Sequence, residues 1–148
     1  MMVAAYAQYI PQDPPAEWRG YEDEIRNVRR RLAGATLIVA DDAGRLAGSV
    51  TYYPDASKET NVAWPPSWAV FRLLAVHPDA RGRGIGRLLT EECVRRARVA
   101  GRGAVGLHTT HLMSVAREMY ERMGFVRVPE LDFYPTPTFS VMAYRLTL

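Results

Sequence analysis

Hydrophobic residues recur every three or four positions in four stretches of the chain, which predicts four amphipathic helices. The stretches are residues 3–10, 21–32, 85–100 and 114–123. A proline or a glycine follows each stretch and predicts the end of its helix: Pro11, Gly34, Gly101 and Gly124. The first helix is expected to be short because Pro14 and Pro15 follow closely.

Stretches rich in β-branched and apolar residues predict the strands: residues 36–40, 46–53, 69–76, 104–109, 125–128 and 139–148. The first two flank the turn sequence Asp41-Asp42-Ala43-Gly44 and predict a β-hairpin. The third is apolar except for Arg72, as expected for a strand covered on both faces in the middle of a sheet. Residues 54–68 are expected to form an ordered surface loop, and residues 129–137 a proline-rich connection.

The order of these elements predicts an α/β fold built on one mixed sheet. Strands joined through a long helix are most easily parallel, whereas strands joined by a hairpin are antiparallel. We therefore expect a central, mostly antiparallel sheet with one parallel βαβ crossover. The chain has 148 residues and no visible internal repeat, so residues 1–148 are expected to form a single domain.

The composition narrows the class of protein. Hydrophobic residues make up 48% of the chain and charged residues 24%, as in a folded globular domain. One cysteine and three histidines do not suit a structural zinc site, and we expect no metal. Cys93 lies on the apolar face of its helix and is expected in the core. Residues 1–10 contain no Lys or Arg and no long apolar stretch exists, so we expect no signal peptide, no membrane span and a cytoplasmic location.

The charge is too small to require nucleic acid as a partner, because the formal excess is only +3. Seven arginines lie between residues 81 and 102, which favours a local anion site. For residues 95–102 the alternative is a solvated helix face.

The segment Arg81-Gly82-Arg83-Gly84-Ile85-Gly86-Arg87 lies between a predicted strand and a predicted helix. Glycines let successive backbone N–H groups turn toward one point, and the helix N-terminus adds a partial positive charge there. The segment therefore predicts a phosphate cradle, with a simple tight turn as the alternative. The P-loop and dinucleotide patterns fit less well, since the chain contains no Gly-Lys pair and the glycine spacing is G-x-G-x-G.

These segments resemble the GNAT superfamily of acyl-CoA-dependent N-acetyltransferases. Residues 74–78 running into Arg81-x-x-Gly84-x-Gly86 are similar to that family's acetyl-CoA motif, Arg/Gln-x-x-Gly-x-Gly/Ala. Residues 120–125, Tyr-Glu-Arg-Met-Gly-Phe, are similar to the family's Tyr-Glu-x-x-Gly-Phe helix ending. The resemblance covers residues 69–128 and extends loosely through the last strand. It implies a GNAT-like fold, acetyl-CoA as co-substrate, and direct attack of a primary amine on the thioester.

The resemblance also implies roles for particular residues. The expected cofactor-binding residues are Leu74, Ala75, Val76, Arg81, Gly82, Arg83, Gly84, Ile85, Gly86, Arg87 and Met113. The backbone of residues 82–87 would cradle the CoA pyrophosphate. The edge of residues 74–76 would pair with the pantetheine, and one of its N–H groups would polarise the thioester carbonyl. Met113 stands where the family often places an Asn that contacts the pantetheine region, and its thioether cannot make that hydrogen bond.

Two residues are the catalytic candidates. Tyr120 would protonate the leaving thiolate, and its alternative role is that of a core tyrosine. His108 stands where some members carry a glutamate as general base, and an unperturbed histidine pKa of about 6.5 suits that role. A structural histidine is the alternative, in which case Glu118 or a chain of waters would serve as base.

The start of the chain departs from the family, whose members usually open with a strand before the first helix. Either the start of the chain is truncated or this member lacks that edge strand. Absence of the strand would leave the hairpin less protected and favour self-association as a homodimer. The acceptor pocket is expected to be lined by residues 11–20 and 129–137, and by Trp64 and Trp68. Acidic residues in these segments would suit a cationic acceptor: Asp13, Glu17, Glu130 and Asp132.

Two other functions remain open from the sequence. A non-catalytic acyl-CoA-binding regulatory module would share the phosphate cradle. A small nucleic-acid-binding domain would use the arginines, although the chain shows no recognisable binding motif and no interleaved aromatic residues.

Overall fold

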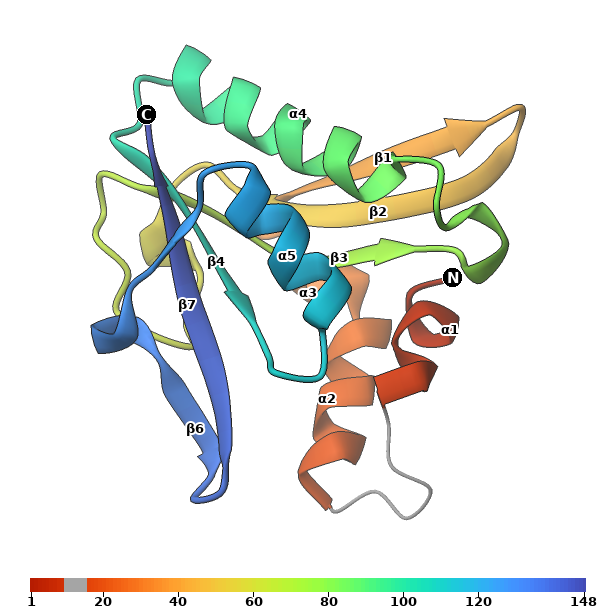
Figure 1. Ribbon diagram of the computed structural model, residues 1–148, viewed down its shortest axis with the longest axis horizontal. Helices are drawn as coiled ribbons and strands as arrows, with labels where there is room; N and C mark the ends of the chain where they lie inside the picture. The colour runs from red at the N-terminus through yellow and green to blue at the C-terminus, as the bar shows by residue number, and fades with distance from the viewer. Residues whose placement is uncertain (10–15) are drawn as a thin grey trace.

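A mixed sheet forms the centre of the molecule in the computed structural model, which describes residues 1–9 and 16–148, with the backbone alone at 16–19. Its strands follow the order β1-β2-β3-β4-β7-β5, with β6 paired to β7 (Figure 1). The strands are β1 Thr36–Asp42, β2 Arg45–Tyr53, β3 Ala69–Val76, β4 Ala104–Thr109, β5 Val126–Arg127, β6 Phe133–Thr136 and β7 Phe139–Thr147. Only β3 and β4 pair in parallel among them. This confirms the predicted mixed sheet with one parallel crossover.

Helices cover both faces of the sheet. They are α1 Met2–Tyr6, α2 Ala16–Arg26, α3 Val28–Arg31, α4 Ile85–Val99 and α5 Ser114–Arg122. The main core lies under α4 and α5 and includes Leu89, Cys93 and Tyr120. On the other face α1 and α2 pack on the end of β3, and the segment between β2 and β3 covers the middle of the sheet. Cys93 is fully buried, as expected, and burial raises the pKa of its thiol to about 12.

The predicted β-hairpin is confirmed, and its turn contains two residues. Ala43 and Gly44 have φ angles of 52° and 84°, which is the left-handed conformation that a tight hairpin turn requires at both central positions. In the described part of the chain no strand precedes β1, which therefore forms one edge of the sheet.

Three local expectations were wrong. The helix predicted over residues 21–32 begins at Ala16 and is interrupted at Asn27, whose side-chain oxygen accepts the Arg30 N–H at 3.2 Å and starts α3. The segment 54–68 is not wholly at the surface, because Trp64 is only 4% exposed. The connection 129–137 contains β6, which tolerates Pro135 because it is paired only to β7 and only at its two ends.

Candidate active site

The parallel strands β3 and β4 separate after three paired positions, the last being Phe71 opposite Leu107. The cause is an irregularity in β3. Leu73 has a φ of 53°, and the register between β2 and β3 shifts at the same place. Beyond this point the edge of β3 that faces β4 has no strand partner. The two strands therefore open a cleft at the centre of the sheet.

The open edge of β3 presents the backbone groups of Leu74 and Val76. The His77 N–H donates to the Ala47 carbonyl at 2.8 Å, and Ala75 lies opposite Ser49, so these alternate residues face β2. Backbone polar groups alternate in direction along a strand, which turns those of Leu74 and Val76 toward the cleft. The Leu74 carbonyl accepts a hydrogen bond from the Tyr6 hydroxyl at 3.0 Å. The remaining groups of this edge are free to pair with an extended ligand.

The glycine-rich segment ends at the N-terminus of α4 beside this edge. Gly82 and Gly84 have φ angles of 73° and 78°, and a side chain added at either position would meet no atom within 4 Å. No side chain caps the helix. The first N–H groups of α4, from Ile85 onward, therefore point into open space without an intrahelical acceptor. This arrangement fits a phosphate group, and both glycines have conformations that favour glycine.

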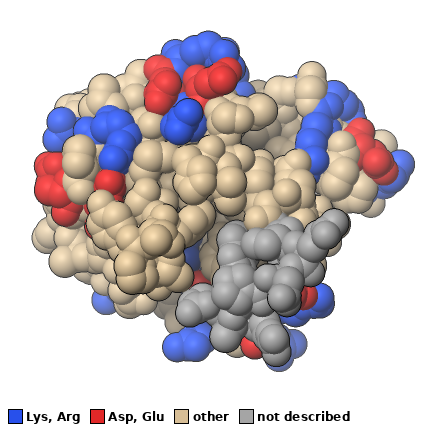
Figure 2. Space-filling view, turned by 60° about the horizontal axis from the view of Figure 1, so that its bottom comes forward, with Lys and Arg blue, Asp and Glu red and all other residues tan. Residues whose placement is uncertain are grey.

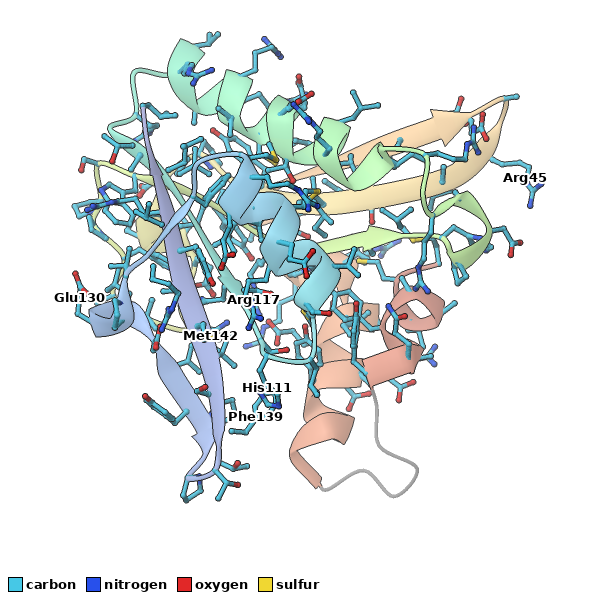
Figure 3. All side chains as sticks on the ribbon, viewed as in Figure 1. Arg45, His111, Arg117, Glu130, Phe139 and Met142 are labelled. Atoms are coloured by element: carbon cyan, nitrogen blue, oxygen red, sulfur yellow. The ribbon has the colours of Figure 1, made fainter. Side chains whose placement is uncertain are left out.

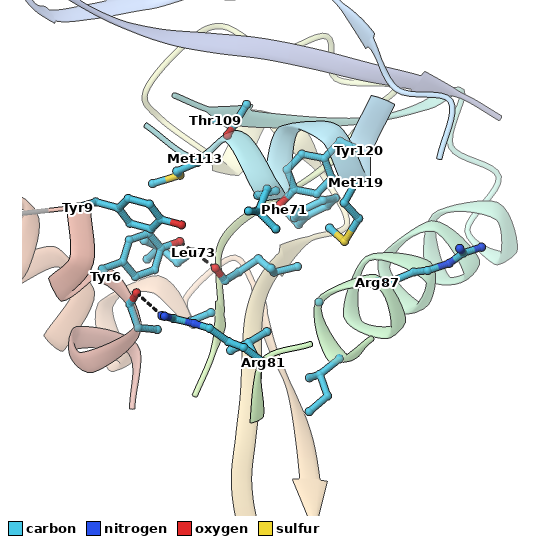
Figure 4. Close-up of a pocket in the computed structure, with 18 of the residues that line it drawn as sticks. Tyr6, Tyr9, Phe71, Leu73, Arg81, Arg87, Thr109, Met113, Met119 and Tyr120 are labelled. Carbon is cyan, nitrogen blue, oxygen red and sulfur yellow. Dashed lines mark hydrogen bonds between the residues drawn. The ribbon is translucent and has the colours of Figure 1, made fainter. Parts of the chain in front are cut away.

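A cavity of about 500 Å³ joins the cleft to the glycine-rich segment (Figure 4). Of the predicted residues it brings together Leu74, Ala75, Val76, Arg81, Gly82, Gly84, Ile85, Gly86, Arg87, His108, Met113 and Tyr120. Arg83 does not line it. The Arg83 guanidinium instead pairs with Asp42 on the neighbouring hairpin at 2.7 Å, and this hydrogen bond lowers the pKa of Asp42.

Arg81 and Arg87 border the cavity in different ways. Arg81 reaches back to the first turn of the chain, where it donates to the Ala5 carbonyl at 3.0 Å and to Gln8 Oε1 at 3.1 Å (Figure 4). Arg87 pairs with Glu91 at 2.7 Å on the exposed side of α4. The arginines further along α4 behave as a solvated face, since Arg95 and Arg96 both pair with Glu92.

Tyr120 lies on the α5 side of the cavity, opposite Tyr6 and Tyr9 (Figure 4). It is 4% exposed, and its ring packs against Phe71 and Phe125 with centroid distances of 5.9 and 5.7 Å. Its hydroxyl has no hydrogen-bond partner among the described residues. Burial raises the pKa of Tyr120, so its phenol is protonated at neutral pH. Tyr120 is therefore both a core residue and a potential proton donor to a ligand.

His108 at the end of β4 also lines the cavity. Its Nε2 lies 2.9 Å from the Leu131 carbonyl oxygen. A carbonyl can only accept, so Nε2 carries a proton and the neutral ring keeps its lone pair on Nδ1. Burial lowers the pKa of His108 from 6.5, which favours this neutral form. The ring is held between Trp64 and Phe133, with centroid distances of 4.7 and 4.9 Å.

The expected aromatic and acidic lining of the acceptor pocket needs correction. Trp64 does not line the cavity, since it packs beneath Gly106 and donates from Nε1 to Glu59 at 2.8 Å. Asp132 forms a bidentate pair with Arg127 at 2.7 Å. Glu130 lies at the outer side of the molecule (Figure 3). Asp13 lies outside the described residues, as does the side chain of Glu17.

Several cavity residues were not predicted: Tyr6, Tyr9, Phe71, Arg72, Leu73 and Thr109. The signal for Arg72 was present, because it is the single charged residue of an apolar strand. Leu73 carries no such signal, since leucine rarely adopts a positive φ. Thr109 Oγ1 is buried without a hydrogen-bond partner in the described part of the chain, so it can bond a ligand.

Beyond the cleft, the β6–β7 hairpin approaches the loop between β4 and α5. His111 in that loop lies against Phe139 at the start of β7, with a ring-centroid distance of 5.5 Å (Figure 3). Among the residues with described side chains, no group of three His, Cys, Asp or Glu could hold a metal ion. No described helix is long and apolar enough to cross a membrane.

Comparisons with known proteins place this architecture among acetyltransferases. Residues 33–127 match the acetyltransferase (GNAT) domain. Over 151 aligned residues the chain is 25% identical to an uncharacterized N-acetyltransferase of Schizosaccharomyces pombe, an alignment that covers all of this chain and 85% of that protein. The domain match spans well over half of the chain, which therefore belongs to the GNAT acetyltransferase family, as its motifs predicted.

Solved structures show the same fold. A putative GNAT-family acetyltransferase from Desulfovibrio desulfuricans has a TM-score of 0.68 and 21% identity, over 91% of this chain and 83% of that chain. A GNAT-family acetyltransferase from Elizabethkingia anophelis, with acetyl-CoA bound, has a TM-score of 0.65 and 14% identity, over 83% and 82% of the two chains. These likenesses confirm the predicted fold class.

Proposed function

We propose that this protein transfers the acetyl group of acetyl-CoA to a primary amine by direct attack, without a covalent enzyme intermediate. The observation that carries the proposal is that one continuous cavity joins the split between β3 and β4 to the open N-terminus of α4. One end suits a pyrophosphate and the strand edge suits an extended amide chain. Acetyl-CoA combines these two features and supplies, when bound, an activated acetyl thioester.

The backbone of this chain would bind and polarise the co-substrate. The N–H groups at the start of α4 would hold the pyrophosphate, and the free edge of Leu74 and Val76 would pair with the pantetheine amides. One N–H of that edge would donate to the thioester oxygen, a contact that strengthens as negative charge develops there. Removing such a donor typically raises a barrier by about 2.7–4 kcal/mol.

Two side chains would move the protons of the reaction. As the amine nitrogen bonds to the acetyl carbon and the carbon–sulfur bond breaks, Nδ1 of neutral His108 would accept the amine proton, directly or through water. The Tyr120 phenol would give its proton to the departing sulfur. The low pKa of His108 and the high pKa of Tyr120 both keep these groups in the required protonation states near pH 7.

The phosphate site can be tested with two matched glycine variants. Gly84 and Gly44 have φ angles of 78° and 84°, and a Cβ would meet no described atom within 4 Å at either position. Valine should therefore strain the backbone similarly in Gly84→Val and Gly44→Val, but only the first places a side chain in the proposed phosphate site. We expect calorimetry to show loss of acetyl-CoA binding in Gly84→Val and normal binding in Gly44→Val. Equal affinity in the two variants would remove the phosphate assignment.

Activity separates the proposed enzyme from a binding module. A screen for thiol release from acetyl-CoA with amines of several classes should find turnover. Tight acetyl-CoA binding without turnover of any amine would instead support the non-catalytic acyl-CoA-binding module.

A further inference from the structure

The part of the cavity that lies away from α4 has an aromatic wall. The Tyr6 ring contacts Tyr9 edge-on, with centroids 6.3 Å apart, and is held in place by the hydrogen bond from its hydroxyl to the Leu74 carbonyl. Met113 lies next to Tyr9, at the start of α5 (Figure 4). Tyr6 is buried and Tyr9 is partly exposed, so the Tyr9 ring is the part of the wall that a ligand reaches first. It offers ring edges and a thioether to a ligand.

The charged groups among the described lining residues of the cavity are all positive. None of its described lining residues is Asp or Glu, and four are arginines: Arg72, Arg81, Arg87 and Arg122. Arg72 lies in β3. Its guanidinium pairs with Glu24 at 2.7 Å and Glu59 at 3.2 Å, neither of which lines the cavity. The charge of Arg72 is therefore compensated by its two carboxylate partners, whereas the described partners of Arg81 are uncharged.

The molecular surface at this end carries both acidic and basic side chains. Figure 2, which looks onto the lower end of the molecule as drawn in Figure 1, shows charged side chains mainly along the borders of the face and uncharged residues in its middle.

We propose, on the basis of the acetyl transfer proposed above, that the acceptor is a monoamine whose amino group is carried on an aromatic or apolar body. An aromatic ring would pack edge-to-face on Tyr6 and Tyr9 and gain both burial and ring–ring contact. A second ammonium group would be buried where no described lining residue is a carboxylate, which is costly. This acceptor class differs from the cationic acceptor expected from acidic loop residues.

Three amines of similar length separate charge from aromatic character: 3-phenylpropylamine, hexylamine and 1,6-diaminohexane. We measure thiol release from acetyl-CoA and compare kcat/KM. The diamine should be poorer than hexylamine by about tenfold or more, with the gap narrowing at high salt because unpaired charges are screened. The phenyl compound should be better than hexylamine by about threefold to tenfold, the value of one aromatic contact.

Variants of Tyr9 test whether the wall causes the preference. Tyr9→Ala should raise KM for 3-phenylpropylamine by about tenfold and erase its advantage over hexylamine, whereas Tyr9→Phe, which keeps the ring, should retain the advantage. An aromatic preference that survives in Tyr9→Ala would overturn the role of this wall.

Turnover and binding of the three amines test the acceptor class separately from the acetyl transfer. Turnover of 1,6-diaminohexane equal to or faster than that of both monoamines overturns the acceptor class and leaves the acetyl transfer intact. If none of the three amines releases thiol, calorimetry on the CoA-saturated protein decides. Binding of 3-phenylpropylamine without binding of the diamine upholds the acceptor class, and absence of binding by all three overturns it.

Discussion

Replacing Tyr120 by phenylalanine separates catalysis from packing, because the hydroxyl of Tyr120 has no partner among the described residues while its ring packs on Phe71 and Phe125. Tyr120→Phe keeps the ring contacts and breaks no described hydrogen bond. The free energy of unfolding should therefore stay within about 0.5 kcal/mol of the wild type. If the hydroxyl protonates the leaving sulfur, kcat should fall by about tenfold to a thousandfold, the usual value of general-acid assistance.

Tyr144 provides the matched control. It is also buried, at 2% exposure, but its hydroxyl donates to Glu121 at 2.8 Å and it does not line the cavity. Tyr144→Phe loses a hydrogen bond to a carboxylate, and such bonds contribute about 1.5–3 kcal/mol. Because Glu121 is exposed to water, we expect the lower value of about 1.5 kcal/mol. At about 2–4 °C per kcal/mol, Tm should fall by about 3–6 °C. Turnover should remain normal.

The two variants should thus show opposite effects, measured by thermal unfolding and by steady-state kinetics at saturating acetyl-CoA. Burial raises the pKa of Tyr120, so the wild-type rate should show no fall below about pH 10 that arises from this group. Full kcat of Tyr120→Phe on a confirmed amine would refute the role of the Tyr120 hydroxyl as proton donor. A loss of stability in Tyr120→Phe as large as that in Tyr144→Phe would show that the Tyr120 hydroxyl has a structural partner, and would also refute this prediction.

Three further outcomes are expected. A Cβ at Gly106 would lie 2.6 Å from the Trp64 ring, so Gly106→Ala should cost about 1–3 kcal/mol by thermal unfolding, whereas Gly103→Ala, with no atom within 4 Å, should be neutral. Arg83→Ala should weaken acetyl-CoA binding modestly and only at low salt, because Arg83 does not line the cavity, whereas the effect of Arg81→Ala should persist at high salt. Because burial lowers the pKa of His108, the acidic fall of kcat/KM should lie below pH 6.5, and a His108→Gln variant that keeps this fall would exclude His108 as its source.

The geometry of the glycine-rich segment could be predicted from sequence because every part of it is local. Glycines at positions 82 and 84 allow positive φ angles, and the following apolar pattern sets the start of α4. The free N–H groups then follow from helix geometry alone. The hairpin between β1 and β2 was predictable for the same reason, since Ala43-Gly44 occupies its own turn without help from distant residues.

The acceptor side of the site could not be predicted, because distant segments assemble it. The split between β3 and β4 depends on a positive φ at Leu73, which no residue type signals. The protonation of His108 depends on the carbonyl of Leu131, in a segment that the sequence indicated only as a connection. The buried position of Trp64 depends on the absence of a side chain at Gly106, forty-two residues later in the chain.

The two halves of the proposed site should differ in how readily substitutions change them. The groups proposed to hold the co-substrate are mainly backbone atoms of one continuous segment, and few side-chain changes can alter them. The proposed acceptor half consists of side chains from the first nine residues, β3, β4 and the turn before α5, such as Tyr9, Arg72, His108 and Met113, which meet only in the folded chain. A single substitution there changes the charge or shape of the wall without touching the cradle. The choice of amine is therefore expected to depend on these side chains, and variants of Tyr9 should alter acceptor preference while acetyl-CoA affinity stays constant.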